Sequence, residues 1–151
     1  MVKKGKIVSV NISKKKSVRK KPVEKVNILV GFGLEGDAHG GNWHRQVSLL
    51  AIESIEKMRS KGLNVNPGDF GENITTQGID LISLPIGTVL KLGKKVLLEI
   101  TQIGKVCHTK CAIYYQAGDC VMPKEGVFAR VLEGGKIKVG DEIEILEVKN
   151  A

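Results

Sequence analysis

The chain is 151 residues long, carries 24 Lys and Arg against 16 Asp and Glu, and has a net charge of +8. That length fits one domain, placed over residues 1–151, and allows a core to form without disulfide staples. No run of about 18 apolar residues could cross a membrane, and Met1 is not followed by an apolar leader. The three cysteines form an odd set, which argues against a disulfide framework. We therefore expect a cytoplasmic protein with reduced thiols.

The composition favours short strands. Eighteen glycines and 4% aromatic residues accompany many short Val, Ile and Leu runs bounded by Gly, Asn, Asp and Lys, a pattern typical of a barrel or sandwich. In chain order, strands are predicted over residues 6–12, 23–30, 46–50, 70–76, 79–92, 95–103, 136–139 and 142–148. The fold class is therefore mainly β, with few helices.

One helix is predicted over residues 51–61. Ile52, Ile55 and Met58 recur at intervals of three, which places them on one apolar face. Gly62 follows as a natural stop. We interpret this helix as scaffold.

A second short helix is predicted over residues 126–133. The apolar pairs Val127-Phe128 and Val131-Leu132 stand at a helical offset, and Gly134 follows them. Arg130 would then face away from the apolar stripe, where its guanidinium could bind an anion bidentately.

A basic run occupies residues 14–21. Its six basic residues are Lys14, Lys15, Lys16, Arg19, Lys20 and Lys21. Such a run attracts phosphates and raises the alternative of a nucleic-acid binder. The run has no neighbouring aromatic residues for base stacking, and charge runs of this kind are usually solvated loops, so nucleic acid is the weaker interpretation.

Residues 104–130 contain all three cysteines, Cys107, Cys111 and Cys120, beside His108. Nearby cations such as Lys105 favour the thiolate, the form that attacks electrophiles or binds metal. One interpretation is that each cysteine is simply a small buried hydrophobe. Another is a zinc-stabilised interaction module, because the three thiols and the imidazole could supply four ligands. The spacing lacks the second short ligand pair of familiar zinc sites.

A third interpretation comes from several motifs that share one order along the chain. They are Gly36-Asp-Ala-His39, Pro67-Gly-Asp-Phe-Gly-Glu-Asn-Ile74, Leu84-Pro-Ile-Gly87, the cysteine segment, Gly126-Val-Phe-Ala-Arg-Val-Leu132 and Gly140-Asp-Glu-Ile143. With them the chain resembles small stand-alone members of the MOSC domain family, named for the C-terminal domain of molybdenum cofactor sulfurases. The resemblance implies a closed or partly open β-barrel, like the barrel of pyruvate kinase, with a few short helices.

The resemblance also implies a site. By this resemblance, Cys107 matches the family cysteine that follows a strand, and Cys111 is compared with the second cysteine of larger relatives. Either would be the reactive thiol or the molybdenum ligand. Val106 stands where a proline often precedes the cysteine, and three residues rather than two separate the thiols. Further pocket residues implied in this way are Asp37, His39, Arg45, Asn73, His108 and Arg130.

The implied function is binding of the molybdenum cofactor (molybdopterin), or transfer of sulfur to it as a cysteine persulfide. Thiolates suit both tasks, and Arg45, Arg130, Lys105 and the basic run are the expected cations for the pterin phosphate. The expected partners are a cysteine desulfurase, which would hold the pyridoxal phosphate itself, and the enzymes that make or receive the cofactor. An independent reductase is disfavoured because so short a chain lacks a second domain.

Overall fold

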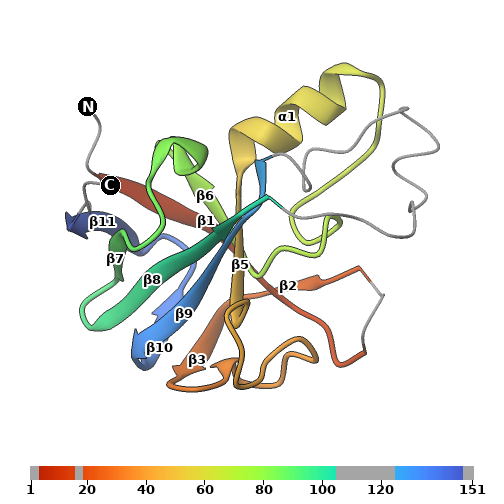
Figure 1. Cartoon of the computed structure of the whole chain (residues 1–151). Coiled ribbons are helices and arrows are strands. Elements are labelled where there is room, and N and C mark those ends of the chain that lie inside the picture. The colour runs from red at the N-terminus through yellow and green to blue at the C-terminus, as the bar shows by residue number, and fades with distance from the viewer. Residues whose placement is uncertain (1–3, 16–18, 105–124, 148–151) are drawn as a thin grey trace.

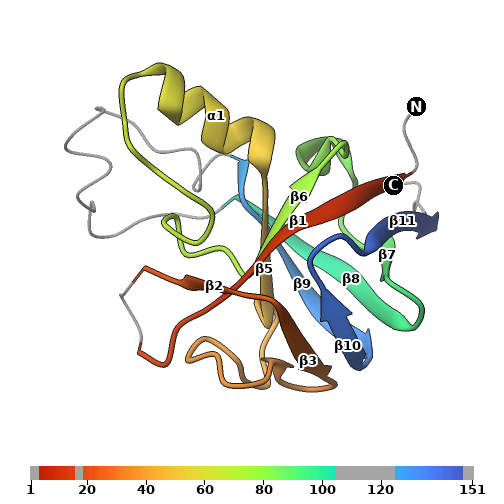
Figure 2. The same cartoon turned by 180° about the vertical axis from the view of Figure 1, so that it is seen from behind.

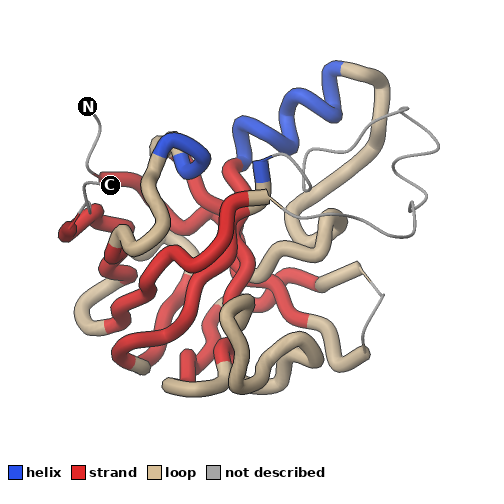
Figure 3. Tube along the Cα trace, in the orientation of Figure 1, coloured by secondary structure: helices blue, strands red, loops and turns tan. Residues whose placement is uncertain are grey.

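Strands dominate the computed structural model, which describes residues 4–15, 19–104 and 125–147 (Figure 3). The strands are β1 (Lys4–Ile12), β2 (Lys21–Val23), β3 (Lys25–Leu29), β4 (Gly33–Leu34), β5 (Val47–Ala51), β6 (Ile74–Gln77), β7 (Val89–Leu92), β8 (Val96–Ile103), β9 (Val127–Glu133), β10 (Gly135–Lys138) and β11 (Glu142–Glu147). The helices in these ranges are α1 (Ile52–Ser60) and the 3₁₀ turn η1 (Leu81–Ser83). The mainly β prediction is confirmed.

Seven strands close into a barrel (Figure 1). Their order is β11-β7-β8-β9-β5-β6-β1, and β1 closes the ring by pairing with β11 at Lys4–Glu144 and Lys6–Glu142. Neighbours are antiparallel except β5 and β6, which run parallel and are connected through α1. The prediction of a closed or partly open barrel is therefore confirmed, and the barrel is closed.

A smaller sheet lies beside the barrel. It has the order β10-β3-β4, while β2 extends the barrel sheet beyond β1 (Figure 2). Residues 23–30 were expected to form one strand, but the chain bends at Glu24 and divides between the two sheets. The predicted strand over residues 79–92 is likewise interrupted, because η1 and the turn containing Pro85 precede β7.

Side chains fill the inside of the barrel. Alternate residues of each strand point inward, and those that are at most 1% exposed include Ile7, Leu49, Ile74, Leu90, Leu98, Ile100 and Ile143. Full burial of one such side chain contributes about 1.5–3 kcal/mol. A small barrel packed in this way leaves its outer face and ends for ligand binding.

The helix α1 covers part of the outside. Its buried residues Ile52, Ile55 and Met58 are the three that the sequence placed on the apolar face. They form a second cluster with Leu50, Val65, Phe70 and Phe128. The helix ends as predicted, since Gly62 has φ +90° and its amide donates to Arg59 O at 2.9 Å.

The predicted helix over residues 126–133 is wrong, because this segment is strand β9. Val127, Ala129 and Val131 point into the barrel, while Phe128 packs outside with the α1 cluster. Both faces of the strand are therefore buried at its start. The adjacent apolar residues Val127 and Phe128, followed by Val131 and Leu132, give the spacing expected of a helix. Arg130 lies on the outer face of a strand rather than on a helix.

Candidate functional site

Two of the predicted pocket residues, Asp37 and His39, meet at a buried lysine. Lys20 Nζ lies 2.7 Å from Asp37 Oδ1 and 2.9 Å from His39 Nδ1. The side chains of Lys20 and Asp37 are 1% and 0% exposed. Ser13 N also donates to Asp37 Oδ1, at 3.0 Å. The basic run, expected to be solvated, thus contributes one cation to the interior.

The pKa of Asp37 is held below its ordinary value. Burial alone would raise this pKa, but the hydrogen bond and charge of Lys20, the Ser13 amide and the nearby Asn73 amide outweigh it. Asp37 Oδ2 has no hydrogen-bond partner within the described part of the chain. Because the folded-state pKa is lowered, the stability that Asp37 contributes is present above its unfolded-state pKa and is lost as pH falls through the folded one.

Asn73, another predicted pocket residue, is bound into the scaffold. Its Oδ1 accepts hydrogen bonds from Ser48 N at 3.0 Å and Ser48 Oγ at 3.1 Å. Its Nδ2 donates to Asn11 O at 3.2 Å. Asn73 therefore joins the start of β5 to the end of β1, and it lies next to Asp37.

Glu72 is a buried carboxylate beside this network. Its Oε2 accepts from Gly68 N at 3.1 Å and Thr75 Oγ1 at 2.8 Å. Its Oε1 has no partner among the described residues. Burial raises the pKa of Glu72 despite the two hydrogen bonds. Glu72 thus favours the protonated form more strongly when the chain is folded.

Glu72→Gln is expected to stabilise the protein increasingly as pH rises. Because the folded pKa of Glu72 is raised, the wild type loses stability between the ordinary glutamate pKa and the folded one. Glutamine can accept the same two hydrogen bonds without charge, and the gain at alkaline pH should be on the order of 1–3 kcal/mol. Urea unfolding across pH measures it, with the exposed Glu56→Gln as control. A constant difference between the two curves would contradict the prediction.

A second group of side chains lies on the outer face of β8 and β9. The half-buried Arg45 has its Cζ 4.5 Å from the ring centroid of Trp43 and 5.5 Å from that of Phe128. Its Nε is buried and has no acceptor within the described ranges. Stacking of this kind fixes a guanidinium in place, and its remaining donors suit a phosphate or carboxylate.

The neighbouring His44 is connected to the end of β8. Its Nε2 lies 2.8 Å from Gln102 Oε1, and Gln102 Nε2 donates to Gly104 O at 2.8 Å. Thr101 Oγ1 donates to His44 O. Because the Gln102 oxygen can only accept, His44 Nε2 is the donor. The loop that carries Arg45 is thereby held to the strand end that precedes the cysteines.

Arg130 lies on the same outer face, two residues along β9 from Phe128. Its Nε is 2.6 Å from Glu99 Oε1 on β8, and its side chain is 53% exposed. An exposed pair of this kind contributes little to stability. Arg130 therefore lies two residues from Phe128, the ring that Arg45 contacts, but is already paired with Glu99.

Cys107, Cys111, Cys120 and His108 lie outside the described residues, as does Lys105. The residues that flank their segment are joined, since Gly104 N donates to Gly126 O at 2.6 Å. Glu125, just before β9, accepts from Ser54 Oγ at 2.6 Å and Lys57 Nζ at 3.1 Å. The cysteine segment thus leaves and rejoins the barrel at one point.

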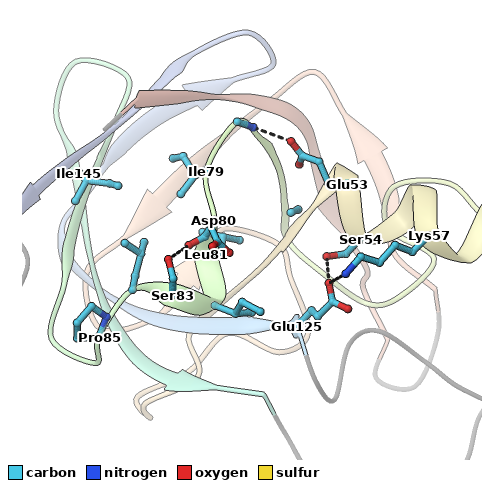
Figure 4. Close-up of a pocket in the computed structure, with 14 residues that line it drawn as sticks. Glu53, Ser54, Lys57, Ile79, Asp80, Leu81, Ser83, Pro85, Glu125 and Ile145 are labelled. Atoms are coloured by element: carbon cyan, nitrogen blue, oxygen red, sulfur yellow. Dashed lines mark hydrogen bonds and ion pairs between the residues drawn. The ribbon is translucent and has the colours of Figure 1, made fainter. Parts of the chain in front are cut away.

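A cavity of about 630 Å³ lies between α1, η1 and the barrel (Figure 4). It is lined by Ser54, Lys57, Ile79, Leu81 and Glu125, among others. None of the described residues predicted for the site lines this cavity. The predicted residues gather instead around Lys20 and around Arg45.

Sequence reasoning missed two residues of this region. Lys20 was grouped with the basic run, and no local signal separates it from its exposed neighbour Lys21. Gln102 is the second, and only its place at the end of a strand leading to the cysteines could have indicated it.

The fold and these contacts define a small β-barrel domain with a filled apolar interior, a buried polar network around Lys20 and a stacked arginine, Arg45, on the outer face. A family model of the MOSC domain matches residues 35–144. The chain belongs to the MOSC domain family, which is associated with the molybdenum cofactor.

Solved structures share the fold. YuaD from Bacillus subtilis has a TM-score of 0.78 and 22% identity, covering 93% of this chain and 94% of that one. YiiM from Geobacillus stearothermophilus has a TM-score of 0.70 and 22% identity, with coverages of 95% and 75%. YiiM from Escherichia coli has a TM-score of 0.69 and 21% identity, with coverages of 97% and 72%.

No curated protein matches the chain. Within the described residues, the helices are too short or too polar to span a membrane.

Proposed function

We propose that this chain binds the molybdenum cofactor, or carries sulfur for it, through Cys107 or Cys111. Family membership supports a role connected with this cofactor. The observation that carries the proposal is the state of Arg45, a stacked guanidinium whose buried Nε has no acceptor among the described residues. An anionic group would supply the missing acceptor.

Arg45, Arg130 and His39 carry donors that fit such a group. Arg45 would hold the phosphate of the pterin, with Arg130 as a second cation if its pair with Glu99 opens. His39 would contribute a hydrogen bond, positioned by Asp37 and by the scaffold that includes Asn73. His108 would act beside the thiols. When bound, the cofactor supplies molybdenum, for which a thiolate is a suitable soft ligand.

The sulfur-carrier form of the proposal uses the same thiols. A thiolate of Cys107 or Cys111 attacks the outer sulfur of a persulfide on a cysteine desulfurase. A new S–S bond forms on this chain as the donor's S–S bond breaks, and the donor leaves as a thiolate. No external oxidant or reductant is needed. Passing the sulfur to a thiol of a partner enzyme repeats this exchange. Passing it to the cofactor as sulfide would take two electrons from a second thiol, which ends in a disulfide with the carrier thiol.

Molybdenum retention tests the proposal. The purified protein is mixed anaerobically with released cofactor, desalted, and its molybdenum is measured per chain. Wild type and Cys120→Ala are expected to retain molybdenum, while Cys107→Ala or Cys111→Ala loses nearly all of it because the ligand is gone.

The pattern of loss distinguishes the two forms. Loss in one variant alone identifies the molybdenum ligand. Absence of retention in wild type contradicts cofactor binding, and persulfide formation with a desulfurase, followed by mass spectrometry, then tests the carrier form. A wild type that neither retains molybdenum nor gains a sulfur atom would refute both.

A further inference from the structure

Lys20 contacts both a carboxylate and an imidazole. Its Nζ is 2.7 Å from Asp37 Oδ1 and 2.9 Å from His39 Nδ1, and its side chain is 1% exposed. An ammonium group has three donors and no acceptor. At the shared 2.9 Å contact, His39 Nδ1 must therefore accept.

This contact determines where the imidazole carries its proton. A neutral imidazole has one protonated and one unprotonated nitrogen. With Nδ1 accepting from Lys20, the proton lies on Nε2. We propose that Lys20 is a positioning residue that fixes His39 in the Nε2–H tautomer.

The surroundings keep Lys20 in this position. Asp37 holds Nζ from the other side, and Ser13 N holds the same carboxylate oxygen. The Lys20 amide donates to Gly68 O at 2.9 Å. A Cβ on Gly68 would lie 2.3 Å from Lys20 O, so the close approach of these two backbones requires glycine there.

The backbone of His39 is fixed as well. Trp43 Nε1 donates to His39 O at 3.1 Å, and the same Trp43 ring stacks on Arg45. The lysine, the histidine and the arginine therefore belong to one connected arrangement. A change at Lys20 would reach the ring of His39 directly and Arg45 only through Trp43.

The contact with Lys20 limits the chemical roles of His39. Its Nδ1 is occupied by Lys20 and is not a metal ligand or a proton acceptor for a substrate. His39 acts as a hydrogen-bond donor through Nε2, whether toward this chain or toward a bound group. If the proposed function holds, His39 would donate to an oxygen of the cofactor; the tautomer assignment itself does not depend on that function.

Nitrogen-15 NMR of the cofactor-free protein tests the assignment. Long-range proton–nitrogen correlations of the imidazole rings are recorded at slightly alkaline pH, and the His39 signals are identified by their loss in His39→Gln. The wild type is expected to show the Nε2–H pattern at His39. In Lys20→Met, the Nδ1 signal should shift toward that of a protonated nitrogen as the second tautomer becomes populated.

Two further variants keep the test decisive. Lys21→Met removes the exposed neighbouring charge and should leave the His39 signals unchanged. Lys20→Gln retains an amide donor and should preserve the Nε2–H pattern. Lys20→Leu has no donor, should show the same shift as Lys20→Met, and serves if Lys20→Met does not fold. The proposal is overturned if wild type shows an Nδ1–H pattern, or if the tautomer is unchanged in whichever of Lys20→Met and Lys20→Leu folds. Because no cofactor is present, this result is separate from molybdenum retention.

Discussion

Replacing Lys20 with methionine is expected to lower the free energy of unfolding by about 3–5 kcal/mol. The substitution keeps the apolar stem but leaves the Asp37 carboxylate buried beside no cation. Chemical unfolding followed by circular dichroism measures the loss. The deficit should shrink as pH falls, because protonation of Asp37 removes the uncompensated charge.

A matched set of variants isolates the pair. Lys21→Met, at the adjacent exposed position, should change stability by less than about 0.5 kcal/mol. The double variant Lys20→Met with Asp37→Leu should recover much of the loss, since no buried charge then remains. If Lys20→Met were as stable as Lys21→Met, the buried ion pair could not have the structural role described.

Replacing Arg45 with alanine is expected to weaken cofactor binding about 10- to 150-fold. This range corresponds to the roughly 1.5–3 kcal/mol of a hydrogen bond to a charged group. Removal of the guanidinium also leaves the Trp43 and Phe128 rings without the group between them. Equilibrium titration with released cofactor, followed by Trp43 fluorescence, gives the dissociation constants.

Three controls separate charge from geometry. Lys94→Ala removes an exposed charge in the β7–β8 turn and should have little effect. Arg45→Lys keeps the charge but loses the planar stacked fork, so its affinity should fall between wild type and alanine. Arg130→Ala should have a smaller effect because Glu99 already binds that side chain. Equal affinity in Arg45→Ala and wild type would exclude Arg45 from the phosphate site.

The barrel could be predicted because its signals are local. Runs such as Val96–Ile103 alternate inward and outward side chains, and the α1 spacing is carried by three residues of one short segment. Strand β9 could not be recognised in the same way. The helix α1 covers its outer face at Phe128, and only the tertiary fold determines that a second face of the strand is buried.

The site was predictable only in part, for a similar reason. The motifs indicated Asp37 and His39, and the fold places them together. Lys20 gave no signal, since its burial follows from the approach of the 66–73 loop to the segment before β2, a contact between residues distant in sequence. Resemblance favoured Asn73 as a pocket residue, whereas its hydrogen bonds to Ser48 and Asn11 give it a structural role as well.

The hydrogen bond between Gly104 and Gly126 bears on how the length of the segment between them can vary. It joins the two ends of the segment between them, beside the pairing of Ile103 on β8 with Val127 on β9. Loop-closure entropy grows slowly, and doubling a flexible loop costs only about 0.6 kcal/mol. We therefore expect the barrel to tolerate insertions or deletions between these glycines. On this expectation, the thiol-bearing part of the chain could diversify while the scaffold stays the same.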